Sequence, residues 1–364
     1  MSKDIFRKEL EQLRPYVPGK PIEEVKREYG LSEIEKMASN ENQLGPSPIA
    51  IEYMKRALNE VNFYPESTAV ELKKDLADYL GVGFDNIVVG NGAEELLSLI
   101  ASTFINQGDE VVVASPSFGI YGITTSLLGA RVVTIPFKDK EYDLDGMLKA
   151  INERTKLVYL CNPNNPTGNI IKKKDMDNFF EKLPEDVVVI LDEAYFEYAM
   201  SESEYPNGLD YLQKRPNTVV IRTFSKVYGL AGLRVGYLIT SKEIADVMNK
   251  AKLTFNVNKL AQEAARGALR DKAHRDKTLE ANAESIKMME NFFDQMGFDY
   301  FKSYTNFMFV DVQKHSKTIF EGLMKKGVIV RPGYLWGWDN WIRVSTATIQ
   351  QTKKFTSSLY TFYL

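Results

Sequence analysis

Short runs of aliphatic and β-branched residues alternate with longer stretches of helical periodicity between about residue 85 and residue 240. Residues 94–104 show the helical pattern, because Leu96, Ile100 and Phe104 fall on one face of a helix. Near-continuous apolar strands separated by helices indicate a mostly parallel sheet with both faces covered. The sequence therefore predicts an α/β fold for this region. Its expected strands are residues 87–89, 110–113, 131–133, 157–160, 187–191, 218–221 and 235–239.

The pattern changes after about residue 255, where a long polar helical tract, residues 260–296, precedes further short strands. This order is typical of a smaller α+β domain. A chain of 364 residues also exceeds one typical domain. The expected strands of the second domain are 306–312, 328–331 and 341–345. We expect an N-terminal segment that packs on the small domain or on a neighbouring subunit, a large domain and a small domain, with limits 1–45, 46–255 and 256–364.

The charge balance gives no basic field for nucleic acid, because 46 basic residues stand against 49 acidic ones and the formal charge is −3. No apolar run approaches the length of a membrane-spanning helix, and Met1–Asp4 opens a charged segment without an apolar signal core. We therefore expect a cytoplasmic protein with no membrane and no nucleic-acid partner.

Cysteine and histidine are scarce in this chain. One cysteine, Cys161, leaves no intrachain disulfide and no multi-cysteine metal site. His274 and His315 lie in polar surroundings, and two histidines are too few for a histidine-based hydrolase or a zinc enzyme. We expect no bound metal, and lysine becomes the leading candidate for the group that transfers protons.

One loop after an expected strand combines a lysine with anion-binding neighbours. Lys226 follows the strand at 218–221, and Arg234 lies eight residues further on, across a glycine-containing loop. A lysine there can form a Schiff base, while Thr223, Ser225 and Arg234 can hold a phosphate. The combination suggests pyridoxal 5′-phosphate (PLP). For this stretch alone, a lysine on a solvated loop beside a helix is the alternative.

Two further loops carry groups that suit the PLP ring. Asp192 ends an apolar strand, where a carboxylate can pair with the protonated pyridine nitrogen. Tyr195 and Asn165 can both reach the phenolic oxygen of the ring. The ordinary alternatives are an acidic helix N-cap at Asp192 and a plain structural turn around Asn165.

Two loops complete the predicted site. The glycine loop at 90–92 joins a strand to a helix, so the backbone N–H groups of Ala93 and Glu94 can bind phosphate. Phe118 can stack on the pyridine ring, with core packing as the alternative. Together the strand-end loops supply an amine, an acid, a stacking ring and a phosphate cradle. We therefore expect a PLP site at the carboxyl edge of the sheet.

These residues give the chain a resemblance to the fold-type I PLP enzymes and, within them, to the histidinol-phosphate aminotransferase family. The resemblance covers nearly the whole chain. The spacing of Lys226 and Arg234 is typical of the aminotransferase class, and the Asn-Glu-Asn signature at 40–42 indicates this branch. The matching segments are 38–48, 64–65, 92–94, 162–168, 192–195, 223–228, 234–237 and 255–258.

The resemblance implies a large domain with a mostly parallel seven-stranded sheet and a smaller α+β domain. It also implies that Lys226 carries the cofactor and moves the proton. Tyr64 would reach the phosphate of the neighbouring subunit's cofactor, which implies a homodimer. Arg343 would bind the carboxylate or phosphate of the substrate, because a guanidinium suits either anion. Asn42, in the early signature, would also contact the substrate.

The implied reaction is a ping-pong transamination between an amino donor and a keto acceptor. The implied substrates are L-histidinol phosphate and 2-oxoglutarate, which give imidazole acetol phosphate and L-glutamate in histidine biosynthesis. Trp336, Trp338 and Trp341 depart from the family pattern. They either pack a loop or line an aromatic pocket, so an aromatic amino acid aminotransferase is the alternative. A PLP-dependent decarboxylase of a phosphorylated amino acid and a non-catalytic PLP-binding regulator are less favoured.

Overall fold

The computed structural model describes residues 5–11, 13 and 19–364. Residues 1–4, which include the predicted charged start Met1–Asp4, lie outside the described residues. The large domain is built on a seven-stranded sheet with the order β2-β8-β7-β6-β5-β3-β4. The strands are β2 Ile87–Gly90, β3 Glu110–Ser115, β4 Arg131–Pro136, β5 Thr155–Cys161, β6 Val188–Asp192, β7 Thr218–Thr223 and β8 Gly236–Ile239. Each predicted strand of this region is present.

All neighbouring strands pair in parallel except β8, which runs antiparallel to both β2 and β7. The predicted α/β class and the mostly parallel seven-stranded sheet are therefore confirmed. The strands read as continuous apolar runs because both faces are buried. In β6, Val189 and Leu191 join one apolar cluster, while Val188 and Ile190 join the cluster on the opposite face.

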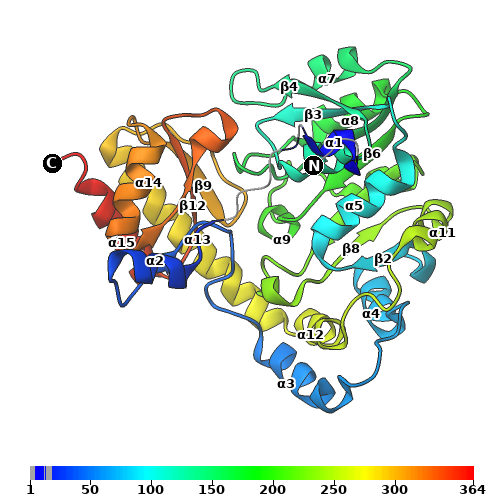
Figure 1. Cartoon of the computed structure of the whole chain (residues 1–364), viewed down its shortest axis with the longest axis horizontal. Coiled ribbons are helices and arrows are strands. Elements are labelled where there is room, and N and C mark those ends of the chain that lie inside the picture. The colour runs from blue at the N-terminus through cyan, green and yellow to red at the C-terminus, as the bar shows by residue number, and fades with distance from the viewer. Residues whose placement is uncertain (1–4, 12, 14–18) are drawn as a thin grey trace.

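Helices cover both faces of the sheet (Figure 1). Their bounds are α3 Pro48–Ala57, α4 Val70–Leu80, α5 Gly92–Phe104, α6 Ile120–Leu127, α7 Leu144–Ala150, α8 Lys173–Lys182, α9 Phe196–Ala199, α10 Gly208–Lys214 and α11 Lys242–Ala251. Short 3₁₀ turns occur at η2 Leu58–Glu60, η3 Phe84–Asn86 and η4 Ala231–Leu233. Helices α5, α6 and α11 pack on one face, whereas α4, α7, α8 and α10 pack on the other.

The predicted helical tract 260–296 is present but is divided into two helices, because the chain breaks at Asp271. Helix α12 spans Lys259–Arg270, and α13 spans Lys272–Met296. The side chain of Asp271 accepts a hydrogen bond from the His274 N–H at 3.1 Å and so caps the start of α13. A capping residue at that point favours two helices with different directions.

Helix α12 packs with the large domain rather than the small one. Ala261 and Ala265 belong to the large apolar cluster, and α12 lies against α3 (Figure 1). The packing is close, since a Cβ on Gly267 would lie 2.8 Å from the Cα of Ala50. We therefore propose a domain boundary after Arg270 instead of the predicted boundary after residue 255.

The small domain contains a three-stranded antiparallel sheet with the order β11-β12-β9. Its elements are α13, β9 Phe307–Asp311, α14 Ser316–Lys325, β10 Val328–Ile329, β11 Arg331–Pro332, η5 Gly333–Trp336, β12 Trp341–Ser345 and α15 Ile349–Tyr360. Its apolar core includes Phe293, Val310 and Phe355, each fully buried. No helix among the described residues is long and apolar enough to cross a membrane.

Much of the N-terminal segment packs on the small domain. Strand β1, Glu35–Lys36, pairs in parallel with β10. Helix α2, Ile22–Tyr29, buries Val25 beside Met324 and Ile329. Further upstream, α1, Lys8–Glu11, contacts α6 of the large domain. The chain before α3 thus reaches both domains of its own subunit.

Candidate active site

A cavity of about 200 Å³ lies at the carboxyl ends of the parallel strands, where loops of both domains meet. We call it the Lys226 cavity. It brings together eleven of the thirteen predicted site residues, which are Ala93, Glu94, Phe118, Asn165, Asp192, Tyr195, Thr223, Ser225, Lys226, Arg234 and Arg343. Asn42 and Tyr64 do not line it in the single chain.

Lys226 follows β7 and points into the cavity. Its Nζ lies 3.4 Å from the carbonyl oxygen of Ser39 and 5.5 Å from the ring centre of Tyr195. Burial, together with the nearby charges of Arg343 and Arg234, lowers the pKa of Lys226 to about 8. A sizeable fraction of this amine is therefore neutral near physiological pH, which suits both a nucleophile and a base.

Asp192 is the last residue of β6 and is 3% exposed. Its carboxylate accepts hydrogen bonds from the Tyr121 hydroxyl at 2.7 Å and from the Ala194 N–H at 3.1 Å. Burial raises the pKa of this carboxyl, and the two hydrogen bonds oppose that shift. A carboxylate buried this deeply needs a cationic or donor partner, and a protonated pyridine nitrogen fits that requirement.

Tyr121 was not among the predicted site residues. It lies in the first turn of α6 and stacks on Tyr159, with ring centres 4.5 Å apart. Burial raises the pKa of Tyr121, so its hydroxyl stays protonated and donates to Asp192. No motif marks this tyrosine in the sequence, because only the packing of α6 over β6 brings it to the carboxylate.

Tyr195 and Asn165 both present donors to one part of the cavity. The Tyr195 oxygen accepts from Asn40 Nδ2 at 2.8 Å, and burial raises the pKa of this phenol, so its own proton remains available to donate. Asn165 Oδ1 accepts from Arg343 Nη1. Arginine has only donors, so this contact fixes the amide orientation and leaves Asn165 Nδ2 as a donor. A phenolic oxygen between them fits this pair.

Asn40 is a second residue that our site prediction missed, although it lies in the quoted signature. It is 1% exposed and has φ 56°, in the left-handed region. Its Oδ1 accepts from Ser345 Oγ at 2.9 Å, and its carbonyl accepts from Asn306 Nδ2 at 2.9 Å. These bonds tie Tyr195 in the large domain to strand β12 and the loop before β9 in the small domain.

A phosphate-sized cradle forms where α5 begins. Ala93 and Glu94 lie in the first turn of α5, so their N–H groups have no partner within the helix. Gly92 allows Arg234 to approach, because a Cβ there would lie 2.5 Å from Arg234 Nη2, and φ at Gly92 is 81°. The helix N-terminus and the guanidinium both favour a dianion.

Thr223, the last residue of β7, and Ser225, in the loop that follows, line the same cavity. The Ser225 N–H donates to Thr223 Oγ1 at 3.1 Å, which fixes the turn that leads into Lys226. The backbone of this turn is therefore set before any ligand binds.

Two arginines lie on the small-domain side of the cavity. Arg343 on β12 is the register partner of Arg331 on β11, and both side chains are buried. Arg343 Nη2 also donates to the Ala38 carbonyl at 2.7 Å. Sequence reasoning identified Arg343 but treated Arg331 only as the end of a strand, since the pairing of β11 with β12 is a tertiary feature. The pair gives this side of the cavity a strong preference for anions.

The two predicted residues outside the cavity occupy different positions. Asn42 Nδ2 donates to the Val227 carbonyl at 2.8 Å and lies 3.3 Å from Thr278 Oγ1, so it braces the Lys226 loop against α13. Tyr64 is 80% exposed and stacks on Phe255, with ring centres 4.4 Å apart. Their proposed contacts with substrate and with a neighbouring cofactor stay predictions.

The three tryptophans do not line the Lys226 cavity. They belong to an aromatic cluster of the small domain formed by Phe301, Phe309, Trp336, Trp338 and Trp341, against which Phe137 of the large domain also packs. Of the two interpretations left open by the sequence, this position favours loop packing over an aromatic substrate pocket.

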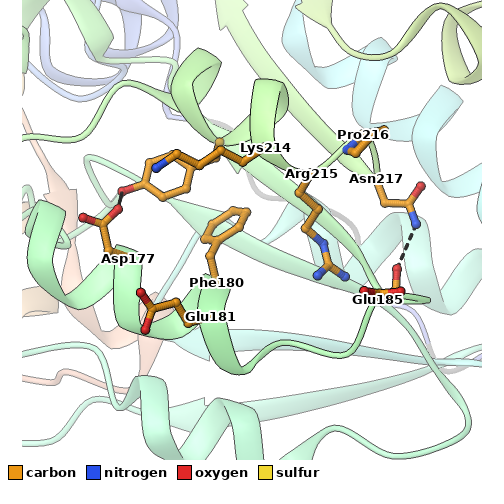
Figure 2. A pocket seen from close by; sticks show the side chains of 9 residues that line it. Asp177, Phe180, Glu181, Glu185, Lys214, Arg215, Pro216 and Asn217 are labelled. Atoms are coloured by element: carbon orange, nitrogen blue, oxygen red, sulfur yellow. Dashed lines mark hydrogen bonds between the residues drawn. The ribbon is translucent and has the colours of Figure 1, made fainter.

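A second hollow, of about 720 Å³, lies at the amino ends of the parallel strands, at the edge of the sheet opposite the Lys226 cavity (Figure 2). Helices α8 and α10 and the segments that precede β6 and β7 form it. We call it the amino-edge groove. Its lining residues are Asp177, Phe180, Glu181, Glu185, Tyr211, Lys214, Arg215, Pro216 and Asn217.

Comparisons with known proteins agree with this geometry. Residues 32–358 match the family model described as aminotransferase class I and II. Histidinol-phosphate aminotransferase 2 of Carboxydothermus hydrogenoformans is 47% identical over 355 residues, which cover 98% of both chains. The enzyme of that name from Moorella thermoacetica is 45% identical and covers 97% of this chain and 92% of its own. A solved structure of histidinol-phosphate aminotransferase from Sinorhizobium meliloti, in complex with pyridoxal-5'-phosphate, has a TM-score of 0.90 at 29% identity and covers 99% of both chains.

Proposed function

The chain belongs to the class I and II aminotransferase family, and we propose that it transfers an amino group between L-histidinol phosphate and 2-oxoglutarate. The resemblance stated from the sequence motifs is thereby confirmed at the level of the family, and the chain is a PLP-dependent aminotransferase. The products of the proposed reaction are imidazole acetol phosphate and L-glutamate. The observation that carries the proposal is one cavity that holds Lys226, a buried carboxylate and three arginines.

The residues of the cavity fit PLP group by group. Asp192 would hold the pyridine nitrogen, while Tyr195 and Asn165 would donate to the phenolic oxygen. When bound, PLP supplies an electron sink that stabilises negative charge on the substrate α-carbon. Its phosphate matches the first turn of α5 together with Ser225 and Arg234. Phe118, which meets Tyr121 edge-on with ring centres 5.7 Å apart, would cover one face of the ring.

Lys226 is the proposed proton carrier. Its lowered pKa makes Nζ able to accept a proton from the α-carbon of the amino donor near neutral pH. The Lys226 ammonium formed in this way would then give its proton to a carbon of the cofactor. One group would thus serve first as base and then as acid. The contact with the Ser39 carbonyl holds the amine in the cavity between the two steps.

Arg343 and Arg331 are proposed to recognise both substrates in turn. Histidinol phosphate carries a phosphate, and 2-oxoglutarate carries a second carboxylate. A ping-pong reaction brings both into one cavity, so the same cations must accept either anion. A guanidinium fork matches the oxygen geometry of both groups.

A second copy of the chain is proposed to complete the active unit. Tyr64 and Phe255 stack on each other and are both exposed, so they form an apolar patch, and Phe63 and Leu253, close to them in the chain, are exposed as well. Patches of this kind in soluble proteins mark association sites. A homodimer would cover the patch and bring Tyr64 toward the neighbour's phosphate cradle. Sedimentation of the purified protein as a monomer at micromolar concentration would contradict this arrangement.

A cytoplasmic setting is also proposed. The single cysteine, Cys161, is buried and reduced, which agrees with a reducing compartment. Both proposed substrates are charged small molecules, so no membrane or nucleic-acid partner is required.

The test of the activity is a panel of amino donors assayed with 2-oxoglutarate and the purified PLP-loaded enzyme. We expect kcat/KM for histidinol phosphate to exceed those for phenylalanine and tyrosine, with stoichiometric formation of glutamate. A higher kcat/KM for the aromatic amino acids would replace the proposal with the aromatic aminotransferase. Release of carbon dioxide from a phosphorylated amino acid would point to the decarboxylase instead.

A further inference from the structure

The guanidinium of Arg343 lies close to two aromatic rings. Its Cζ is 5.2 Å from the ring centre of Phe307 and 5.4 Å from that of Trp336. Both distances are within the range in which a ring attracts a cation. Arg343 is only 5% exposed, so water weakens this attraction less than it would at the surface.

Trp336 does not line the Lys226 cavity, but its ring lies beside Arg343, which does. It is the last residue of the turn η5 and is partly buried. On its other side, the ring meets Phe309 edge-on, with ring centres 6.0 Å apart. Phe309 is fully buried, so the aromatic cluster supports Trp336 at its position against Arg343.

Two hydrogen bonds of Arg343 act on the edge of its guanidinium. Nη1 donates to Asn165 Oδ1, and Nη2 donates to the Ala38 carbonyl. A guanidinium is planar and presents its donors along its edge, while its faces suit aromatic rings. Rings near the guanidinium together with hydrogen bonds at its edge restrict the rotamers of the side chain.

We propose that Trp336 is a positioning residue that holds Arg343 in the orientation that binds the carboxylate or phosphate of the substrate. This inference rests on the proposed function, in which Arg343 binds that anion. Without the ring, Arg343 gains rotamers and hydration that must be lost again when an anion binds. One of the three tryptophans that depart from the family pattern, Trp336, thereby acquires a role in anion affinity, although it does not line the cavity.

Succinate is a suitable probe, because it carries two carboxylates but no amino or keto group and cannot react. We expect Trp336→Leu to raise the calorimetric Kd of succinate for the PLP-loaded enzyme by roughly 3- to 20-fold. The KM for 2-oxoglutarate rises by a similar factor, whereas kcat changes by less than about twofold. Trp336→Phe keeps a ring beside Arg343 and restores the Kd to within about threefold of the wild-type value.

Trp338→Leu is the matched control. Trp338 packs in the same aromatic cluster, with its ring centre 5.7 Å from those of both Phe301 and Phe309. Loss of this ring removes comparable packing, so Tm falls in both leucine variants. Only Trp336→Leu is expected to weaken the binding of succinate. If Trp336→Leu does not fold, Trp336→Met is measured in its place and must show the same rise in Kd.

Two results with the variants overturn the inference. One is an unchanged succinate Kd in Trp336→Leu, and the other is an equal rise in Trp338→Leu, which would reduce the cluster to a support of the fold. Wild-type enzyme that fails to bind succinate overturns it as well. If the wild-type enzyme binds succinate but does not convert histidinol phosphate, only the proposed substrate is wrong. The comparison of succinate Kd values between the variants then still decides the role of Trp336.

Discussion

The two edges of the large sheet carry the same types of side chain but in different environments. The Lys226 cavity contains a lysine, an arginine, a tyrosine and an aspartate, and the amino-edge groove contains the same set in Lys214, Arg215, Tyr211 and Asp177 (Figure 2). The groove is also the larger hollow, at about 720 Å³ against about 200 Å³. Neither residue type nor volume therefore distinguishes the catalytic edge.

The hydrogen bonds make the difference clear. In the groove, Arg215 donates to the carbonyls of Leu183, Pro184 and Val187 at the chain segment before β6. The Tyr211 hydroxyl donates to Asp177 at 2.8 Å. Arg215 and Tyr211 therefore serve the fold, because these hydrogen bonds all run to neighbours in the same part of the large domain.

At the carboxyl edge, by contrast, the polar groups come from separate loops and from both domains. Parallel strands that end at one edge bring their following loops together, and the small domain closes over them. The result is a buried site with a lysine of lowered pKa and a carboxyl of raised pKa. The site is identified by the convergence of polar groups from several loops and by their burial, rather than by the size of the hollow.

The largest expected difference between the edges is at their lysines. We expect Lys226→Ala to lower kcat by roughly 10³-fold or more, because it removes the proposed proton carrier. Lys214→Ala, at the groove, should leave kcat within about twofold. Turnover of histidinol phosphate with 2-oxoglutarate measures both. An equal loss in the two variants would break the distinction between the edges.

Glycines with positive φ give the next comparison. Gly92→Ala would place a Cβ 2.5 Å from Arg234 Nη2, so we expect the Kd for PLP to rise by about 10- to 100-fold. Gly108→Ala has a similar backbone strain, with φ 90°, but meets no atom within 4 Å. It should lower the stability without changing the Kd, as fluorescence titration with PLP would reveal. If Gly108→Ala also raised the Kd for PLP, the effect of Gly92→Ala would be due to backbone strain alone and not to the contact with Arg234.

The pH dependence of cofactor loading tests the pKa of Lys226. Only the neutral amine attacks the aldehyde of PLP, so the loading rate of the apoenzyme should rise about tenfold between pH 6 and pH 7 and level off above about pH 8. Stopped-flow absorbance measures this rate. A rate that still rises tenfold per unit above pH 9 would indicate a lysine with an ordinary pKa.

The same lowered pKa affects stability. The unfolded chain binds more protons at this group than the folded apoenzyme does between about pH 8 and the ordinary value of 10.5. The contribution of Lys226 to the free energy of unfolding therefore rises with pH across that window. It is lowest below pH 8, where the buried amine must carry a charge. Lys226→Met should remove this part of the pH dependence of Tm.

The smallest effect on activity is expected at Arg215. Arg215→Met removes the donors to three carbonyls and should lower the free energy of unfolding by about 1 to 3 kcal/mol. Its kcat/KM should remain within about twofold of the wild-type value, since the groove takes no part in the reaction. Denaturant unfolding and steady-state kinetics measure the two effects. A large loss of activity in a stably folded variant would assign the groove a role in the reaction.

Much of the fold could be predicted from the sequence, because local patterns of apolar residues indicate where the strands lie. The apolar runs gave the seven strands, and Asp192 and Lys226 were identified from their positions at strand ends. Motif spacing also placed Arg343 on the correct strand. These predictions depend on residues that are near one another in the chain, where periodicity and turn chemistry are informative.

The missed features depend on pairings between distant segments. Tyr121 reaches Asp192 only through the packing of α6 on the sheet, and Arg331 joins Arg343 only through the register of β11 and β12. The break at Asp271 went unseen because the polar tract on both sides has helical character.

The sequence by itself determined the α/β class, the family and the group of residues around the lysine. Only the tertiary structure decided how the predicted carboxyl edge becomes reactive, because burial and packing set the pKa of Lys226 and the partners of Asp192. The same holds for Trp336, whose contact with Arg343 arises from the fold of the small domain. Residue types specify the available chemistry, while the dielectric and the contacts that tune it are produced by packing.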